Sequence, residues 1–304
     1  MRAINCSRFV AAAVLALAVA GVQAQSPVVV SSKIDTEGSV LGQLIIQTLE
    51  ANGIPTENRL QLGGTSIVRE AIKAGEIDLY PEYTGNGAFF FDRADEPGWN
   101  DATTAYETVR ALDAGQNDLV WLQPAPANNT WAMSVRRDLA ESEGLTTLDD
   151  LADYLNAGGA FRFAASAEFV DSASALPAFQ AAYGFELTAD ELLVLSGGDT
   201  AATMRAAAQS DNDVNGAMTY GTDGGISALG LVVLEDNRGV QPVYQPAPIV
   251  REPVLEAYPS IEDHLAPLFS NLDLETLQTL NARVAVQGQP AREVAAGYLE
   301  QMNR

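Results

Sequence analysis

Cysteine and histidine, two residue types that serve in many catalytic sites, are nearly absent from this sequence of 304 residues. Its one cysteine, Cys6, and its one histidine, His264, lie near opposite ends of the chain. A Cys–His catalytic pair and a histidine-rich zinc site therefore both lack their residues. No stretch matches a phosphate-binding loop, a dinucleotide-binding glycine motif or a serine-hydrolase elbow. We accordingly predict a protein that binds its ligand without converting it, and that uses no cofactor or metal.

Positive charge is also scarce. The chain holds 40 acidic against 17 basic side chains, which gives a formal net charge of −23. Such an excess argues against binding to nucleic acid or to an anionic membrane surface. Only two of the basic residues are lysines, Lys33 and Lys73. Lys33 follows a run typical of a strand and is a candidate ligand contact, with an ordinary surface lysine as the alternative.

The first 24 residues have the pattern of a secretory signal peptide. Arg2 and Arg8 precede an apolar run over 9–22, and the residues that end at Ala24 suit a cleavage site. A run of this length is too short to span a bilayer. We expect cleavage of this Sec signal peptide (1–24), a periplasmic location, and a mature chain without cysteine and hence without disulfide bonds.

Apolar runs typical of strands alternate with helical patterns along the rest of the chain. Strands are expected at 28–31 and 77–80, each followed by a polar loop, with helices at 39–51 and after 63–64 between them. The tail over 260–304 is expected to be helical in three pieces. In a parallel sheet both polar loops would lie at the carboxyl ends of strands, where open α/β sheets bind small molecules.

Proline-containing connectors interrupt this alternation twice, at 124–129 and at 240–248. The prolines of the second connector argue against a central strand there. We therefore predict an α/β fold of two lobes. Lobe I is discontinuous and comprises 25–128 and 241–304, and lobe II comprises 129–240. This is the plan of a type II periplasmic binding protein, a clamshell with two hinge crossings.

Aromatic side chains occur repeatedly where a predicted strand meets a loop. Four of them, Tyr83, Trp131, Tyr220 and Tyr244, come from both predicted lobes and the second crossing. Rings that converge can enclose a quaternary ammonium through their negative faces, at roughly 0.5–2 kcal/mol per ring. Lys33 could then bind a ligand carboxylate. The alternative for each ring taken singly is a place in the hydrophobic core or at its rim.

Several longer stretches carry a resemblance to a known family. They are 32–37, 63–65, 78–85, 124–132, 220–224 and 244–251. On these stretches the chain resembles, along nearly its whole length, the glycine betaine/choline-type substrate-binding proteins of osmoprotectant ABC importers. The resemblance implies two α/β lobes with a hinged cleft between them.

The resemblance also implies roles for single residues. The family's cage rings fall on the four aromatic positions named above, its carboxylate-binding lysine on Lys33, and a polar contact, usually threonine, on Asn86. A backbone carbonyl that faces the ammonium falls on Asn129. Where tight betaine binders carry an arginine, this chain has Ser172. A missing bidentate cation costs on the order of 1.5–3 kcal/mol for a carboxylate ligand, so we expect weak betaine binding or a ligand without a carboxylate, such as choline.

The function implied by this resemblance is that of a monomeric binding component of an importer for glycine betaine, choline or a related quaternary amine. Its partners would be an inner-membrane ABC permease and a cytoplasmic ATPase, and the ligand would shift the lobes towards a closed form. The sequence leaves open an amino acid or a polyamine as cargo of the same scaffold. It also leaves open a secreted hydrolase or transferase, and a binding protein that serves a sensor receptor.

Overall fold

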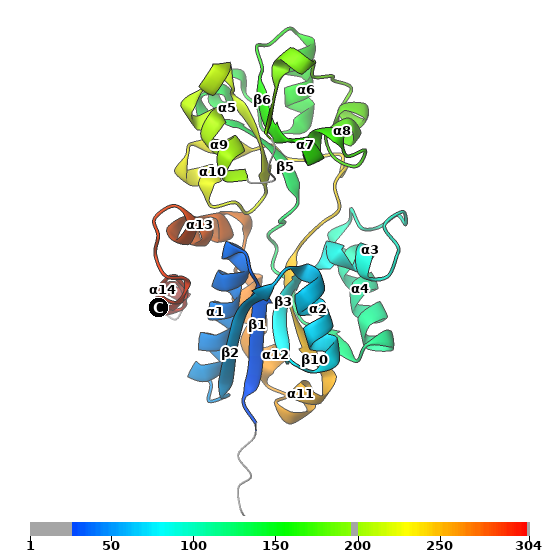
Figure 1. Ribbon diagram of the computed structural model, residues 1–304, viewed down its shortest axis with the longest axis vertical. Helices are drawn as coiled ribbons and strands as arrows, with labels where there is room; N and C mark the ends of the chain where they lie inside the picture. Colours follow the sequence, from blue (N-terminus) through cyan, green and yellow to red (C-terminus); the bar gives the residue numbers. More distant parts are fainter. Residues whose placement is uncertain (1–25, 196–199, 303–304) are drawn as a thin grey trace, which may run out of the picture.

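The computed structural model describes residues 26–195 and 200–302, which form two five-stranded sheets, each flanked by helices (Figure 1). The sheets lie in two lobes stacked along the long axis of the molecule. The expected signal peptide at 1–24 lies outside the described residues. None of the described helices combines the length and the apolar character needed to cross a membrane.

Lobe I contains the sheet with strand order β2-β1-β3-β10-β4. Its strands are β1 Val28–Lys33, β2 Thr56–Gly63, β3 Leu79–Tyr83, β4 Leu119–Trp121 and β10 Pro246–Arg251. β1 pairs in parallel with β2 and β3, whereas β10 runs antiparallel to β3 and β4. The carboxyl ends of β1 and β3 therefore lie together, at the end of the sheet that faces lobe II (Figure 1).

Helix α1, Thr36–Ala51, shows why the segments of lobe I fold as they do. The carboxylate of Asp35 caps its N-terminus by accepting a hydrogen bond from the backbone N–H of Gly38 at 2.6 Å. Leu41, Leu44 and Ile45 recur at helical spacing and are fully buried. Each such side chain contributes roughly 1.5–3 kcal/mol on burial.

The expected C-terminal helices pack against α1, although they come last in the chain. They are α12 Ile261–Ser270, α13 Leu274–Ala285 and α14 Ala291–Met302, so the prediction of three helical pieces is confirmed. The opposite face of the sheet is covered by the remaining helices of this lobe except the short α11 Glu252–Ala257, whose Val254 and Leu255 pack against the same core as α1. Those covering helices are α2 Thr65–Ala74, α3 Gly87–Phe90 and α4 Ala102–Gln116.

Lobe II repeats the same topology with the strand order β7-β6-β8-β5-β9. Its strands are β5 Trp131–Arg136, β6 Phe163–Ser166, β7 Leu192–Leu195, β8 Gly216–Tyr220 and β9 Leu231–Val233. Its helices are α5 Arg137–Glu143, α6 Leu148–Asn156, α7 Ala167–Asp171, α8 Leu176–Tyr183, α9 Thr200–Gln209 and α10 Gly225–Ala228. β6 pairs in parallel with β7 and β8, and β5 runs antiparallel to β8 and β9.

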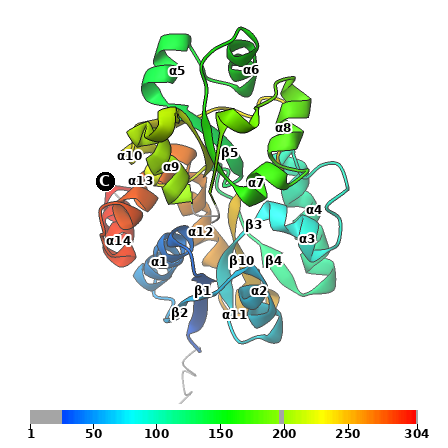
Figure 2. The same cartoon turned by 45° about the horizontal axis from the view of Figure 1, so that its top comes forward.

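The chain crosses between the lobes twice, from β4 to β5 and from β9 to β10. In each lobe the strand that arrives by a crossing runs antiparallel to both of its neighbours: β10 lies between β3 and β4, and β5 lies between β8 and β9. This arrangement confirms the predicted two-lobed α/β fold. The boundaries placed at 128 and 240 stay predictions. Both views place α10 of lobe II on the side of α13, and α7 and α8 on the side of α3 and α4 (Figures 1 and 2).

One prediction about the second crossing is wrong. β10 begins at Pro246 and lies between β3 and β4, although the prolines were expected to exclude a central strand. Pro248 lies opposite Pro81 of β3, and its carbonyl accepts a hydrogen bond from the N–H of Leu122. In an antiparallel pair the backbone N and the carbonyl of one residue point towards the same neighbouring strand. Pro248 has no N–H to donate, and its N therefore points towards the chain just beyond the last residue of β4, Trp121. The prolines therefore interrupt few ladder hydrogen bonds.

Strand β2 was not predicted at all. Its sequence, TENRLQLG, lacks apolar alternation, and most of its side chains are exposed. It forms because its backbone pairs in parallel with β1 at the edge of the sheet. Such pairing is a tertiary effect that overrides weak strand propensity.

Candidate ligand-binding site

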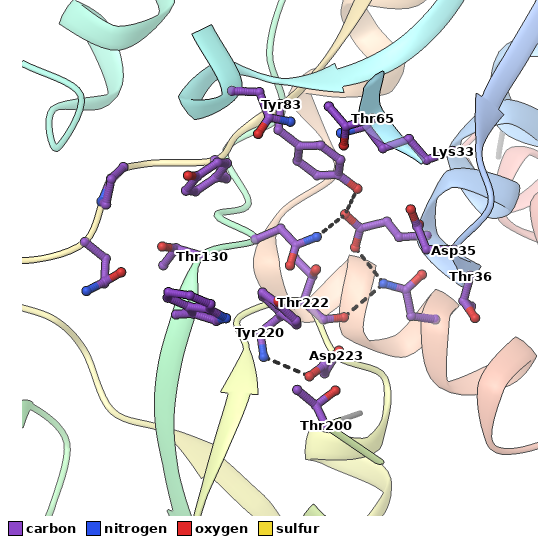
Figure 3. Close-up of a pocket in the computed structure, with 18 of the residues that line it drawn as sticks. Lys33, Asp35, Thr36, Thr65, Tyr83, Thr130, Thr200, Tyr220, Thr222 and Asp223 are labelled. Carbon is purple, nitrogen blue, oxygen red and sulfur yellow. Dashed lines mark hydrogen bonds between the residues drawn. The ribbon is translucent and has the colours of Figure 1, made fainter. Parts of the chain in front are cut away.

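A cleft of about 1390 Å³ is lined by residues of both lobes. All eight residues singled out from the sequence line it: Lys33, Tyr83, Asn86, Asn129, Trp131, Ser172, Tyr220 and Tyr244. The parallel strands of lobe I contribute through their carboxyl ends, and lobe II contributes the start of β5 and the end of β8. Figure 3 shows Lys33 and Tyr83 on one side of the cleft and Tyr220 with Thr222 on the other.

Two of the rings are neighbours because of strand register. Trp131 lies directly opposite Tyr220 in the antiparallel pair of β5 and β8. The Trp131 indole also packs edge-on against Phe169, with ring centroids 5.8 Å apart, and this contact fixes its orientation. Tyr220 is 36% exposed, so it presents surface to the cleft.

The other two rings belong to lobe I and the second crossing. Tyr83 ends β3, is 6% exposed, and donates its hydroxyl to a carboxylate oxygen of Glu37 at 2.7 Å. Tyr244 packs closely on Gly85, where a Cβ atom would come within 2.9 Å of the tyrosine ring. Burial raises the pKa of Tyr244 to about 12, so its hydroxyl is protonated at neutral pH. Both tyrosines are thus held by local packing and hydrogen bonds.

Lys33 is bound to a buried carboxylate that was not predicted. Its Nζ donates to Oε1 of Glu82 at 2.5 Å, and the two residues are 7% and 0% exposed. Nζ also lies 4.6 Å from the centre of the Tyr83 ring. Glu82 falls within the matched stretch 78–85, but nothing in its spacing indicated that it would pair with a residue on β1. The lysine is therefore part of an ion pair in the wall of the cleft.

A second buried carboxyl group, Glu37 in the first turn of α1, was also missed. It is 5% exposed and accepts hydrogen bonds from the Tyr83 hydroxyl, from Asn129 Nδ2 at 3.2 Å and from Asn281 Nδ2 at 2.7 Å (Figure 3). Burial raises its pKa to about 7, and hydrogen bonds from Thr222, Tyr83 and Asn281 oppose the rise. The sequence signal was its place in the matched stretch 32–37, directly after β1.

The loop after β8 rests on helix α13 and joins the lobes at a further point. Asn281 Nδ2 donates both to Glu37 and to the backbone carbonyl of Thr222, at 2.9 Å. Gln278 donates to the carbonyl of Gly221 at 2.8 Å. Gly224 lies so close to α13 that a Cβ atom would come within 2.2 Å of its main chain. Lobe II is therefore anchored beside the cleft by contacts with the C-terminal helices.

Carboxyl groups outnumber basic groups among the described lining residues. Five acidic residues line the cleft, Asp35, Glu37, Asp95, Glu168 and Asp223, against two basic residues, Lys33 and Arg205. The side chain of Ser172 interacts with Ser174 at 3.0 Å and provides no charge. Within residues 26–195 and 200–302, no group of three or more His, Cys, Asp or Glu is arranged to hold a metal ion. Such an acidic cleft attracts cations.

Comparisons with known proteins show the family to which the chain is similar. A family model described as the substrate binding domain of ABC-type glycine betaine transport systems matches residues 26–301. The glycine betaine-binding protein YehZ of Escherichia coli strain K12 is 58% identical over 279 residues, which cover 92% of each chain. A glycine-betaine-binding protein of Pseudomonas aeruginosa is 30% identical over 278 residues, 90% of this chain and 86% of the relative.

Solved structures resemble the whole described chain. Apo YehZ from Escherichia coli matches with a TM-score of 0.88 and 57% identity, covering 91% of this chain and 99% of that chain. A structure described as a glycine betaine/carnitine/choline ABC transporter matches with a TM-score of 0.80 at 19% identity, covering 91% and 98% of the two chains. The second match supports the two-lobed fold.

Proposed function

Because the chain belongs to the family of substrate-binding domains of ABC-type glycine betaine transport systems, we propose that it binds a quaternary amine between its lobes and delivers it to a membrane permease. Members of this family serve ABC importers, in which an ATPase drives the permease. For this chain we propose delivery in the periplasm, as a monomer and without bond chemistry.

The observation that carries this proposal is four aromatic rings from both lobes around one acidic cleft. A quaternary ammonium has no N–H to donate, so ring faces and carbonyl oxygens are its fitting partners. Tyr83, Trp131, Tyr220 and Tyr244 would supply the rings, and the backbone carbonyl of Asn129 would face the ammonium. At roughly 0.5–2 kcal/mol per ring, the set could offset the cost of association and give micromolar affinity, about −8 kcal/mol.

Betaine and choline differ at the end away from the ammonium, which is a carboxylate in betaine and a hydroxyl in choline. The groups that meet this end therefore determine which of the two binds more tightly. The family resemblance assigns to Ser172 the position of an arginine that would bind a carboxylate from lobe II, and Ser172 carries no charge. Lys33 is already paired with Glu82. Arg205 lines the cleft from α9, but its side chain is exposed to solvent, where its charge is screened. Weak betaine binding, roughly tenfold to over a hundredfold below that of a site with a bidentate arginine, is the expected result.

Titration calorimetry with choline, glycine betaine, carnitine, a polyamine and an amino acid tests the cargo. We expect micromolar choline binding and at least tenfold weaker binding by the Trp131→Ala variant, because an indole face is lost from the cage. Tyr298→Ala is the matched control: this ring on α14 is partly buried and does not line the cleft. Heat from the amino acid or polyamine, with none from any quaternary amine, would overturn the proposed cargo.

A further inference from the structure

Glu82 does not itself line the cleft, but its carboxylate contacts three residues that do, Lys33, Tyr83 and Asn86. Its Oε1 accepts hydrogen bonds from Lys33 Nζ at 2.5 Å, from the backbone N–H of Tyr83 at 2.7 Å and from Asn86 Nδ2 at 2.7 Å. Its Oε2 accepts from the hydroxyl of Tyr80 at 3.0 Å. The residue is completely buried. A buried carboxylate with so many donors is held in place and cannot turn away when a ligand enters.

The pairing changes what Lys33 can offer a ligand. The side chain of Lys33 is 8% exposed, and its charge is compensated by Glu82. A ligand carboxylate that approached Nζ would have to share the ammonium with a second carboxylate fixed beside it. Like charges at such short range repel strongly in a poorly solvated site. The Lys33–Glu82 pair therefore offers a ligand little net positive charge.

The same carboxylate orients Asn86. A carboxylate only accepts hydrogen bonds, so the amide nitrogen of Asn86 must face Glu82 and its oxygen Oδ1 must face elsewhere. Asn86 is partly exposed and lines the cleft. Its amide oxygen can accept a hydrogen bond from a ligand hydroxyl, whereas it repels a ligand carboxylate.

From these contacts we propose that Glu82 is a specificity-determining residue, which makes the polar end of the site select a quaternary amine with a hydroxyl group over one with a carboxylate. This inference rests on the proposed function, because it concerns the ligand of the same cleft. Glu82 acts on the ligand through Lys33 and Asn86 and is therefore a positioning residue.

The first test compares the dissociation constants of glycine betaine and choline in wild type and Glu82→Gln. We expect the ratio of the betaine constant to the choline constant to fall at least tenfold, because the variant frees the charge of Lys33. Glu70→Gln is the matched control, since Glu70 forms an exposed pair with Lys73, the other lysine of the chain. The ratio in this control should equal that of the wild type.

A second variant allows the inference to be tested even if Glu82→Gln does not fold. Lys33→Met combined with Glu82→Gln replaces the ion pair by two neutral side chains of similar length. We expect both ligands to bind within about threefold of wild type, because the original pair already offers little net charge. If Lys33 instead grips the carboxylate, betaine binding alone should weaken at least tenfold.

The outcomes separate this inference from the proposed function. Choline binding by the wild type with a selective loss of betaine in the double variant would overturn the role of Glu82 and leave the proposed cargo intact. An unchanged ratio in a folded Glu82→Gln variant would do the same. A wild-type protein that binds no quaternary amine would overturn the proposed function and this inference with it.

Discussion

Replacing Glu37 by glutamine should remove a pH dependence from the stability of this protein. The carboxyl group is 5% exposed, and burial raises its pKa from 4.5 to about 7. The cause is desolvation of the charged form, and the hydrogen bonds from Thr222, Tyr83 and Asn281 compensate only in part. Folding is thus more favourable when Glu37 is protonated.

The sign and the size follow from proton linkage. In the unfolded chain the carboxyl group ionises near 4.5, so between pH 4.5 and about 7 the folded protein binds more protons than the unfolded chain. The free energy of unfolding contributed by Glu37 is therefore fully present below pH 4.5 and is lost as the pH rises through about 7. The shift corresponds to about 3 kcal/mol.

Urea unfolding of ligand-free wild type and Glu37→Gln, at intervals from pH 4 to pH 8, measures this contribution. The difference between the two free energies of unfolding cancels the titration of the other carboxyl groups. We expect this difference to change by about 3 kcal/mol, with the variant gaining on the wild type as the pH rises. Asn281→Leu removes a hydrogen-bond donor that lowers the pKa of Glu37. In this variant the loss of stability with rising pH should therefore occur at higher pH than in the wild type. A difference curve that is flat within about 0.5 kcal/mol would refute the assignment of a buried, proton-binding Glu37.

Two further predictions concern the scaffold. Asp113 is completely buried and accepts two hydrogen bonds from Arg69, so Asp113→Ala should lower the free energy of unfolding in urea by about 3–5 kcal/mol. Glu57→Ala, which breaks an exposed ion pair, should cost less than about 1 kcal/mol, and equal costs would contradict the importance of burial. Gly224→Ala should push the loop after β8 off α13 and open the cleft, seen as a larger radius of gyration in X-ray scattering and weaker choline binding. Gly115→Ala, where a Cβ atom meets nothing within 4 Å, should change neither quantity.

The sequence alone was sufficient to predict the fold class, the two crossings and eight of the residues that line the cleft. The fold class, the crossings and five of these residues, Lys33 and the four rings, depend on local patterns: apolar runs at strand spacing, and aromatic or polar residues at strand ends. Because β1 and β3 are parallel neighbours, their carboxyl ends lie side by side, and this brings Lys33 and Tyr83 together. The resemblance to a known family added Asn86, Asn129 and Ser172.

Only the tertiary structure decided which groups those residues contact. Lys33 and Glu82 are 49 positions apart, and Glu37 and Asn281 are 244 positions apart, so no local pattern relates them. The strand at Pro246 and the polar strand β2 likewise form because of the neighbours that they pair with. Burial determines whether Glu37 is ionised, and it places Glu82 beside Lys33, so that little net positive charge is available to a ligand. Burial itself results from packing between distant segments of the chain.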